Sequence, residues 1–236
     1  MLELNKIYNC DALEFMKQVP DKYFDCIFSD VPYIINSGGG NAESKSGFGW
    51  KNRQDNELVR KGKLFKHNEI TEKDYLPPLY RVLKDGGHIY IMTNSLHLAN
   101  IQKEMEATGF LINNILVMIK ENTVTNQHYM KNCEFTIFAR KGASRGLKDF
   151  GINSAIKVSK KDEGKYHDSQ KPIEYVKKLV WNSTPNDGVV FDPFMGSGTT
   201  AIAAQSLGLK WVGCELEPDY VAIANKRLGK VQGSLF

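Results

Sequence analysis

The sequence lacks any long hydrophobic run, and no stretch approaches the roughly 20 apolar residues that a membrane-spanning helix requires. Its N-terminus, MLELNKIYNCDALEF, also lacks the basic and then apolar stretches of a signal peptide, because acidic residues stand in their place. These two absences argue against a membrane protein and against secretion. We therefore expect a soluble, cytoplasmic protein with no membrane partner.

Cysteine is scarce, and strong charge of one sign is missing. Cys10, Cys26, Cys133 and Cys214 are scattered singly, with no C-x-x-C pair and no histidine cluster at ligand spacing. This pattern argues against a zinc site and against a disulfide framework, and we expect no metal. The net charge of +4 is modest and by itself says little about partners.

The sequence does contain enough apolar residues for one core. With 236 residues and 42% hydrophobic content, we predict a single domain over 1–236 that carries insertions. Short apolar runs alternate with helical patterns, which indicates the α/β class with a mostly parallel sheet and helices on both faces. The expected strands are Lys6–Cys10, Phe24–Ser29, Gly87–Thr93, Ile112–Ile119, Glu134–Ala139, Gly188–Phe191 and Lys210–Cys214. The expected helices are Ala12–Gln18, Glu72–Leu83, Leu96–Thr108, Ile173–Asn182, Thr199–Leu207 and Pro218–Leu228.

Two basic segments interrupt this alternation. Asn36–Ile70 is rich in glycine and then in lysine and arginine, and Arg140–Lys165 carries many basic residues against few acids. Such segments usually lie outside the core, so each alone is typical of a solvated loop. Together, beside a nucleotide-type sheet, they favour a nucleic-acid surface. The candidate DNA-binding residues are Lys51, Arg53, Lys63, Lys157, Lys160 and Lys161.

A glycine-rich turn follows the apolar run Gly188–Phe191 in GVVFDPFMGSGTTAIAAQSLG. Gly196 and Gly198 allow the backbone to approach a ligand, and the N–H groups at the start of the next helix favour an anionic group. The turn is not a P-loop, because no lysine follows Gly198, and Ala201 occupies the third glycine position of a dinucleotide fingerprint. The pattern favours a cofactor cradle; an ordinary strand-to-helix turn is the alternative.

Two acidic residues follow other expected strands. Glu215 ends the run KWVGCE, where a carboxylate is placed to accept hydrogen bonds from ribose hydroxyls. Asp11 follows the first short strand and precedes a helix, where it is expected to act as an N-cap, a role compatible with a second one. Both positions therefore fit a nucleoside held at the carboxyl ends of parallel strands.

The run Phe24–Ser29 is followed directly by the stretch DVPY, which alone is typical of a strand end and turn. Together with DPFMGSGTT and with HDSQKP, at His167–Pro172, it resembles the D-P-P-Y, F-x-G-x-G and H-P-T-Q-K-P motifs of S-adenosylmethionine-dependent DNA amino-methyltransferases. The catalytic motif comes first and the cofactor motif last, which is the order of the permuted beta group. The resemblance extends from Tyr8 to Leu228.

The resemblance implies a Rossmann-like methyltransferase fold with circularly permuted motif order, S-adenosyl-L-methionine as cofactor and duplex DNA as partner. It implies a DNA clamp loop at 36–70 and a target-recognition region at about 121–165. The implied cofactor-binding residues are Asp11, Ala12, Ser169, Lys171, Asp192, Pro193, Phe194, Gly196, Ser197, Gly198, Thr199, Thr200 and Glu215. The implied catalytic residues are Asp30, Val31, Pro32 and Tyr33.

The resemblance implies that the target base is flipped out of the DNA duplex into the active site. Asp30 and the backbone carbonyl of Val31 would each accept a hydrogen bond from the exocyclic amino group and orient its lone pair toward the methyl group. Pro32 would stiffen the turn, and Tyr33 would stack on the base. Val31 replaces the first proline of the family motif, a change that leaves its carbonyl available.

Several functions are compatible with these motifs. Adenine N6 is the expected target because Asp30 opens the catalytic motif, and cytosine N4 is the alternative. Cytosine C5 is not expected because the chain has no Pro-Cys nucleophile. A catalytically silent DNA-binding homologue and an RNA or protein amide methyltransferase are further alternatives. Candidate partners are a second copy of the chain and a separately encoded cognate restriction endonuclease.

Overall fold

The computed structural model describes residues 2–31, 70–121, 129, 132–158 and 171–232. The chain divides into two compact units, one made of Met1–Val31 with Glu72–Phe236 and the other of Pro32–Thr71. Only Ile70 and Thr71 of the second unit are among the described residues. This second unit overlaps the insertion expected over 36–70, and the single-domain organisation over 1–236 stays a prediction.

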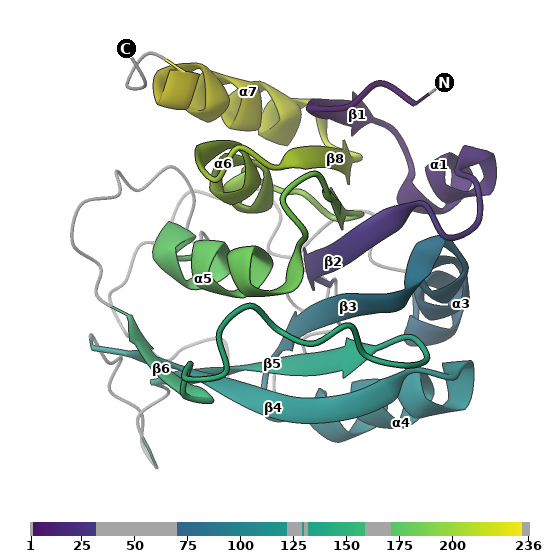
Figure 1. Cartoon of the computed structure of the whole chain (residues 1–236). Coiled ribbons are helices and arrows are strands. Elements are labelled where there is room, and N and C mark those ends of the chain that lie inside the picture. The colour runs from purple at the N-terminus through teal and green to yellow at the C-terminus, as the bar shows by residue number, and fades with distance from the viewer. Residues whose placement is uncertain (1, 32–69, 122–128, 130–131, 159–170, 233–236) are drawn as a thin grey trace, which may run out of the picture. The chain divides into compact units, whose positions relative to one another are not determined.

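An eight-stranded sheet with the order β1-β8-β7-β2-β3-β5-β4-β6 runs through the first unit (Figure 1). The strands are β1 (Lys6–Asn9), β2 (Phe24–Asp30), β3 (Leu83–Thr93), β4 (Leu111–Lys120), β5 (Cys133–Arg140), β6 (Ala155–Val158), β7 (Val189–Asp192) and β8 (Lys210–Glu215). β5 pairs antiparallel with β3 and β4, and the other pairings between described strands are parallel. The predicted mostly parallel sheet is therefore confirmed.

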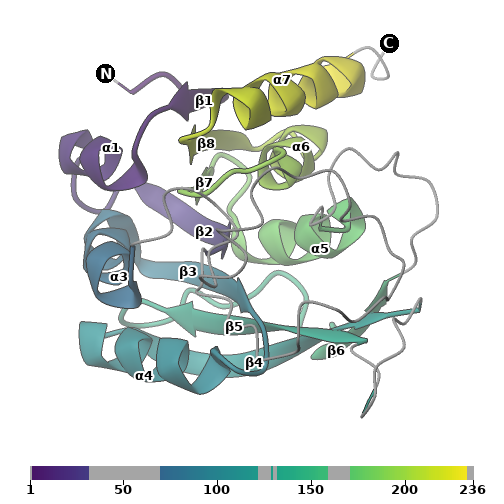
Figure 2. The same ribbon diagram turned by 180° about the vertical axis from the view of Figure 1, so that it is seen from behind.

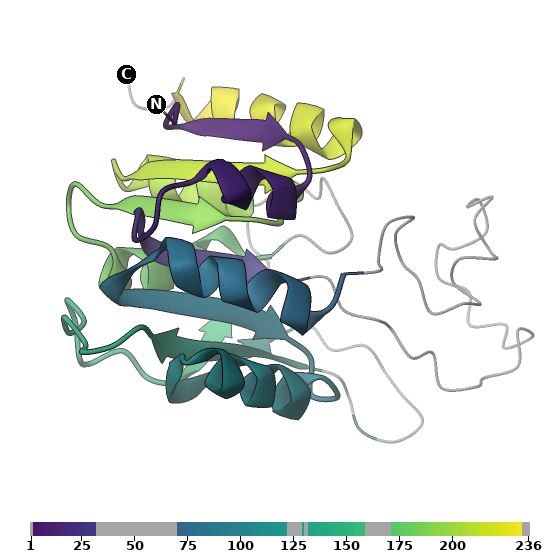
Figure 3. The same cartoon turned by 90° about the vertical axis from the view of Figure 1, so that its right-hand side faces the viewer.

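Helices cover both faces of this sheet. They are α1 (Ala12–Gln18), α3 (Glu72–Val82), α4 (Leu98–Thr108), α5 (Ile173–Ser183), α6 (Thr199–Ser206) and α7 (Pro218–Gln232). Figure 2 shows α1, α3 and α4 on the face opposite to α5 and α6, and Figure 3 looks onto the layer of α1, α3 and α4. Contacts of α1 with α3, of α3 with α4, and of α5 and α7 with α6 agree with these two layers.

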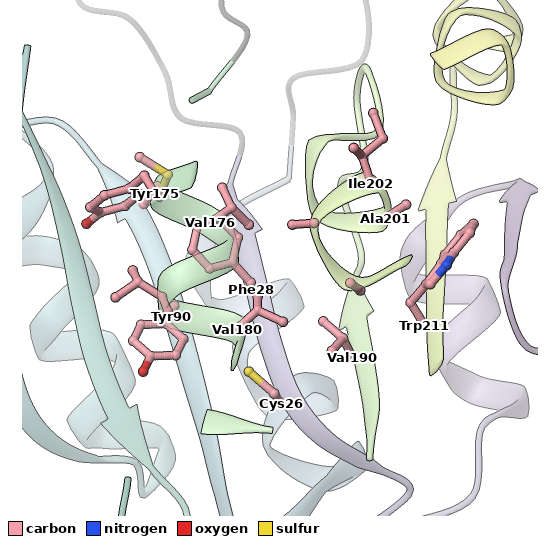
Figure 4. Packing of buried hydrophobic residues seen from close by; sticks show 14 of the residues in the cluster. Cys26, Phe28, Tyr90, Tyr175, Val176, Val180, Val190, Ala201, Ile202 and Trp211 are labelled. Carbon is pink, nitrogen blue, oxygen red and sulfur yellow. The ribbon is translucent and has the colours of Figure 1, made fainter. Parts of the chain in front are cut away.

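The main hydrophobic core lies between the sheet and the layer of α5 and α6. In Figure 4 the side chains of Phe28 on β2 and of Val176 and Val180 on α5 point toward one another. Tyr175 on α5 adds a polar contact, because its hydroxyl lies 2.8 Å from Oγ1 of Thr136 on β5. This packing positions the segment just before α5 over the ends of β2, β3 and β5.

One strand was not expected from the sequence. The segment Arg140–Lys165 was predicted to lie outside the core, yet residues 155–158 form β6, which pairs with the carboxyl-terminal end of β4. Ile156 is only 7% exposed and belongs to the core. The prediction is wrong for these four residues, because β4 provides a hydrogen-bonding edge that local sequence does not reveal.

Two basic residues of the same segment, the buried Lys141 and the exposed Arg145, donate hydrogen bonds to backbone carbonyl groups of the fold. The Lys141 ammonium is buried and donates to the carbonyl oxygens of Tyr80 and Leu83, at 2.7 and 2.9 Å. The Arg145 guanidinium donates to the carbonyl oxygens of Asp25 and Ser183, at 2.5 and 2.7 Å. Asp25 stands near the start of β2, so Arg145 lies at the amino-terminal end of the sheet. Both residues stabilise the fold by satisfying carbonyl groups.

Most of the predicted helices and strands agree with the structure to within a few residues. The expected helix at Leu96 begins instead at Leu98, because Oδ1 of Asn94 accepts from the N–H groups of Leu96 and His97 and holds them in a turn. Among the described residues, no helix has the length and apolar character needed to span a membrane.

Candidate active site at the carboxyl edge of the sheet

Four acidic residues from the sequence prediction lie at the ends of four adjacent strands. Asp11 follows β1, Glu215 ends β8, Asp192 ends β7 and Asp30 ends β2, and these strands are neighbours in that order. Parallel strands end at the same edge of a sheet, so residues far apart in the chain come together there. Asp11 also fulfils its expected local role, because its Oδ1 accepts from the N–H groups of Leu13 and Glu14 at the start of α1.

The chain leaves β7 and β2 in opposite directions. β7 leads through α6 to β8 on one side, whereas β2 pairs with β3 on the other side. Ligands of open α/β sheets bind at such a topological switch point, beyond the carboxyl ends of the strands. Asp192 and Asp30 end the two strands at this point, so the predicted cofactor motif and the predicted catalytic motif meet there.

The glycine turn after β7 has two glycines with left-handed backbone conformations. Gly196 has φ 53° and Gly198 has φ 86°. Residues other than glycine rarely adopt this left-handed backbone conformation. A Cβ atom on Gly198 would lie 2.7 Å from the Cβ of Ala224 on α7, whereas a Cβ on Gly196 would meet nothing within 4 Å. Gly198 therefore allows helix packing, and Gly196 borders open space that a ligand can use.

Glu215 is tied to this turn by hydrogen bonds. Its Oε2 accepts from the N–H group of Gly196 at 2.8 Å, and its Oε1 accepts from the N–H group of Glu217 at 2.9 Å. Burial raises the pKa of the Glu215 carboxyl, and these two N–H groups oppose the shift. The side chain is only partly buried, which leaves lone pairs for the hydroxyl groups of a ligand.

Asp192 holds the turn from within. Its carboxylate accepts from the hydroxyls of Ser29 and Thr200, at 2.9 and 2.6 Å, and from the N–H group of Phe194 at 3.1 Å. Burial raises the pKa of Asp192 to about 7, although these hydrogen bonds lower it. The carboxylate thus links the end of β2 to the cofactor turn and to the start of α6.

An arginine on α7, not singled out from the sequence, contacts the same turn. Nη1 of Arg227 donates to the carbonyl oxygen of Ser197 at 2.6 Å and to its hydroxyl at 3.0 Å. The residue is 4% exposed, so its side chain is part of the support of the turn. One arginine in an amphipathic helix gives no sequence signal for this role, because the contact depends on how α7 packs against α6.

Asp30 belongs to a network of four charged side chains. Nζ of Lys171, two residues before α5, lies 3.0 Å from Oδ2 of Asp30 and 3.0 Å from Oε2 of Glu134 on β5. Oε1 of Glu134 also pairs with Lys120 at the end of β4. The resemblance assigned Lys171 to the cofactor, and the structure places its ammonium between two carboxylates.

The pKa values in this network follow from burial and pairing. Burial raises the pKa of Asp30, while the Lys171 ammonium opposes the increase. Burial alone would lower the pKa of Lys171 and raise that of Glu134, but their pairing outweighs burial, so the pKa of Lys171 is raised and that of Glu134 is lowered. Glu134 and Lys120 were not among the predicted site residues, because no local motif marks them.

The other predicted site residues fall into three groups. Ala12, Pro193, Thr199 and Thr200 are buried, Phe194 is partly buried, and Val31 is 2% exposed at the end of the first unit. Lys157 is exposed on β6, opposite Ile119 of β4. The remaining residues lie outside the described part of the chain: Pro32, Tyr33, Lys51, Arg53, Lys63, Lys160, Lys161 and Ser169.

A family model described as DNA methylase matches residues 24–226, which is most of the chain and includes the turn, Asp30 and Glu215. The chain belongs to the DNA methylase family. The match confirms the resemblance to the S-adenosylmethionine-dependent DNA amino-methyltransferases. It also establishes the methylase as an enzyme that modifies DNA and uses S-adenosylmethionine.

Curated relatives agree with this membership. The methylase is 28% identical, over 244 residues, to the type II methyltransferase M2.LlaDCHI of Lactococcus lactis subsp. cremoris, with 95% of this chain and 89% of the relative covered. It is 27% identical to M2.DpnII of Streptococcus pneumoniae, with 94% and 88% covered. M.HinfI of Haemophilus influenzae is also 27% identical, with 97% and 69% covered.

Solved structures share the fold. The M1.HpyAVI–SAM complex matches the methylase with a TM-score of 0.72 at 20% identity, and 94% of this chain and 98% of that chain are covered. The PvuII DNA methyltransferase, described as cytosine-N4-specific, matches with a TM-score of 0.72 at 14% identity, with 97% and 90% covered. The predicted Rossmann-like methyltransferase fold is thereby confirmed.

The residues present fit S-adenosylmethionine. Gly196 borders open space at the turn, and the partly exposed carboxylate of Glu215 stands beside it as an acceptor for ribose hydroxyls. Among the described residues, no cluster of three or more histidine, cysteine, aspartate or glutamate side chains could hold a metal ion.

Proposed function

We propose that the methylase transfers a methyl group to the exocyclic N6 of an adenine that is flipped out of duplex DNA. The observation that carries this proposal is the position of Asp30. Its carboxylate ends β2 at the switch point, next to β7, and Ser29 links β2 to Asp192 and thereby to the cofactor turn. An acceptor for an amino group and a cradle for the methyl donor thus lie at the ends of neighbouring strands.

The chemistry follows from the poor nucleophilicity of an exocyclic amine, whose lone pair is delocalised into the base. Asp30 accepts one amino hydrogen bond and the carbonyl of Val31 accepts the other, which draws the nitrogen toward tetrahedral geometry. S-adenosylmethionine, when bound, would supply the methyl group: the carbon–sulfur bond would break to leave a neutral thioether, and the nitrogen would lose one proton to solvent. Because Lys171 contacts Oδ2 of Asp30, we expect Oδ1 to face the amino group.

The cofactor roles we propose follow the same geometry. Glu215 accepts from ribose hydroxyls, and the turn at Gly196 and Ser197 lies against the cofactor. Asp192 and Thr200 shape that turn from inside, because Asp192 accepts the Thr200 hydroxyl. Pro32 and Tyr33, which lie outside the described residues, would stiffen the loop and stack on the base.

The relatives support a place in restriction and modification. M2.DpnII and M2.LlaDCHI are named type II methyltransferases, and we propose the same context here, in the cytoplasm, with a restriction endonuclease encoded separately and a homodimer as candidate assembly. The DNA-binding residues we propose are Lys157 and, outside the described residues, Lys51, Arg53, Lys63, Lys160 and Lys161.

Cytosine N4 is the second candidate target, since its exocyclic amine needs the same two acceptors, and a cytosine-N4-specific enzyme shares the fold. The test is methyl transfer from labelled S-adenosylmethionine to unmethylated bacterial DNA, followed by nucleoside analysis. Asp30→Ala, which removes the acceptor oxygens, is compared with the matched control Asp187→Ala, at an exposed residue just before β7 at the opposite edge of the sheet.

We expect labelled N6-methyladenine with the wild type and with Asp187→Ala, and a rate about a hundredfold to a thousandfold lower with Asp30→Ala, whose cofactor binding is retained. Label in N4-methylcytosine would keep the mechanism and overturn the choice of base. Full activity of Asp30→Ala would overturn the role of Asp30. Absence of label with a wild type that binds both DNA and cofactor would favour a silent DNA-binding protein.

A further inference from the structure

Four charged side chains from four separate elements converge beside the proposed catalytic carboxylate. Asp30 ends β2, Lys120 ends β4, Glu134 is the second residue of β5, and Lys171 precedes α5. β5 runs antiparallel to its neighbours, so its first residues lie at the carboxyl edge, and β3 separates it from β2. Lys171 therefore spans the end of β3 to join β2 with β5.

The two carboxylate oxygens of Glu134 pair with two different lysines. Its Oε2 lies 3.0 Å from Nζ of Lys171, and its Oε1 pairs with Lys120. Lys171, whose side chain is 14% exposed, has the same 3.0 Å separation from Asp30 and from Glu134. The Lys171 ammonium divides its donors equally between two carboxylates, and with Lys120 the network holds two positive and two negative charges.

We infer that Glu134 is a positioning residue for methyl transfer: by sharing Lys171, it keeps the ammonium from pairing fully with Asp30, so that the Asp30 carboxylate can accept the target amino group. This inference rests on the proposed function of Asp30. Glu134 does not touch the substrate in this account. It acts through Lys171, and Lys120 acts on Glu134 in the same way.

The electrostatic consequences have definite signs. The groups that face Asp30 are Lys171, Glu134 and Lys120, together with Asp192 across the switch point. The negative charge of Glu134 raises the pKa of Asp30, and the positive charge of Lys120 lowers it. Neutralising Glu134 should therefore lower the pKa of Asp30, and neutralising Lys120 should raise it. Because opposite shifts follow from these two charges alone, the rate of methyl transfer in Glu134→Gln is the readout that distinguishes positioning from support of the fold.

The test compares Glu134→Gln and Lys120→Gln with Glu174→Gln. Glu174 is a matched control because its carboxylate is exposed in the first turn of α5 and pairs only weakly with Lys177 at 3.4 Å. The pKa of Asp30 is measured by carbon NMR of labelled aspartate carboxyls, with its resonance assigned by its absence in Asp30→Asn. The single-turnover rate of methyl transfer is then measured against pH, with cofactor and DNA saturating.

We expect Glu134→Gln to lower the pKa of Asp30 by about half a unit or more and to reduce the plateau rate about tenfold, as full pairing with Lys171 predicts. Lys120→Gln should move the pKa and the acid limb of the rate profile upward. Glu174→Gln should match the wild type, and the cofactor Kd of Glu134→Gln should stay within about threefold of the wild-type value.

Unchanged pKa and rate in Glu134→Gln, or shifts of the same sign in both variants, would overturn the inference. A shifted pKa with an unchanged rate would also overturn it, because pairing would then not limit transfer. If Glu134→Gln does not fold, Lys120→Gln decides through its plateau rate, which should not fall because Glu134, released from Lys120, pairs more fully with Lys171; a tenfold loss of rate would overturn the inference. Failure of the proposed function is distinct, because it shows as an active Asp30→Ala or as no DNA methylation by the wild type.

Discussion

The two glycines of the cofactor turn should respond differently to the same substitution. Gly198→Ala places a Cβ at φ 86° and 2.7 Å from the Cβ of Ala224, with the Ala224 Cα at 3.2 Å. The left-handed conformation costs roughly 1–2 kcal/mol, and overpacking typically costs about 1–3 kcal/mol. The free energy of unfolding should therefore fall by about 2–5 kcal/mol. Gly196→Ala, at φ 53° with open space around it, should lose only the first part.

A second substitution separates the two contributions. Ala224→Gly removes the atom that the new Cβ would meet, at a cost of about 0.5–1 kcal/mol for a glycine inside a helix. In the background of Gly198→Ala it should nevertheless recover part of the overpacking cost, although the left-handed strain remains, which gives a positive coupling in a double-mutant cycle. Urea unfolding of the four proteins, followed by circular dichroism, measures the coupling.

Cofactor binding should show the reverse order. A methyl group on residue 196 projects into the open space of the turn. Gly196→Ala should therefore raise the Kd for S-adenosylmethionine more than Gly198→Ala does. Isothermal titration at a temperature where all variants are folded measures the Kd. Equal stability of Gly198→Ala and Gly196→Ala, or no rescue by Ala224→Gly, would refute the assignment of Gly198 to helix packing.

Two further outcomes follow from the structure, and a third from the sequence. The pKa of Asp192 is raised from 3.8 to about 7 on folding, so the folded state binds more protons than the unfolded state between these values. The free energy of unfolding should therefore fall by up to about 4 kcal/mol as pH rises through that window. Asp192→Asn should flatten this pH dependence, as measured by urea titrations. Glu215→Gln should weaken cofactor binding by about tenfold to a hundredfold, as measured by titration calorimetry, and unchanged affinity would exclude a contact with the ribose. Neutralising Lys160 and Lys161 together should weaken DNA binding and reduce the slope of log K against log salt by about 1.8, and an unaltered slope in filter binding or anisotropy would remove both from the interface.

Local patterns in the sequence were sufficient for most of the elements. The run before Asp30 and the run before Asp192 both form strands, and the helix after Gly198 begins at Thr199. Asp11 caps α1 as its position predicted. Such features depend on neighbours within a few residues, because turn chemistry, capping and periodic burial are local properties. The four-residue strand β6 was missed, since its pairing partner is distant in the chain.

The basic segment after β5 shows a limit of composition. The number of basic residues in this segment led to the prediction that Lys141, Arg145 and Lys157 lie on one surface. Lys141 and Arg145 instead donate to backbone carbonyl groups, whereas Lys157 is exposed on β6. A long basic side chain can lie on the surface or end at a buried carbonyl, and only the packing around it selects between these outcomes.

The class of fold was predictable from the alternation of short apolar runs with helical patterns, and the glycine turn and the family were predictable from short motifs and their order along the chain. Only the tertiary structure decided that Lys171 stands between Asp30 and Glu134, and that Arg227 holds Ser197. These contacts arise where strands that are distant in the chain become neighbours at one edge of the sheet. Their energies depend on distance and burial, which residue spacing does not encode.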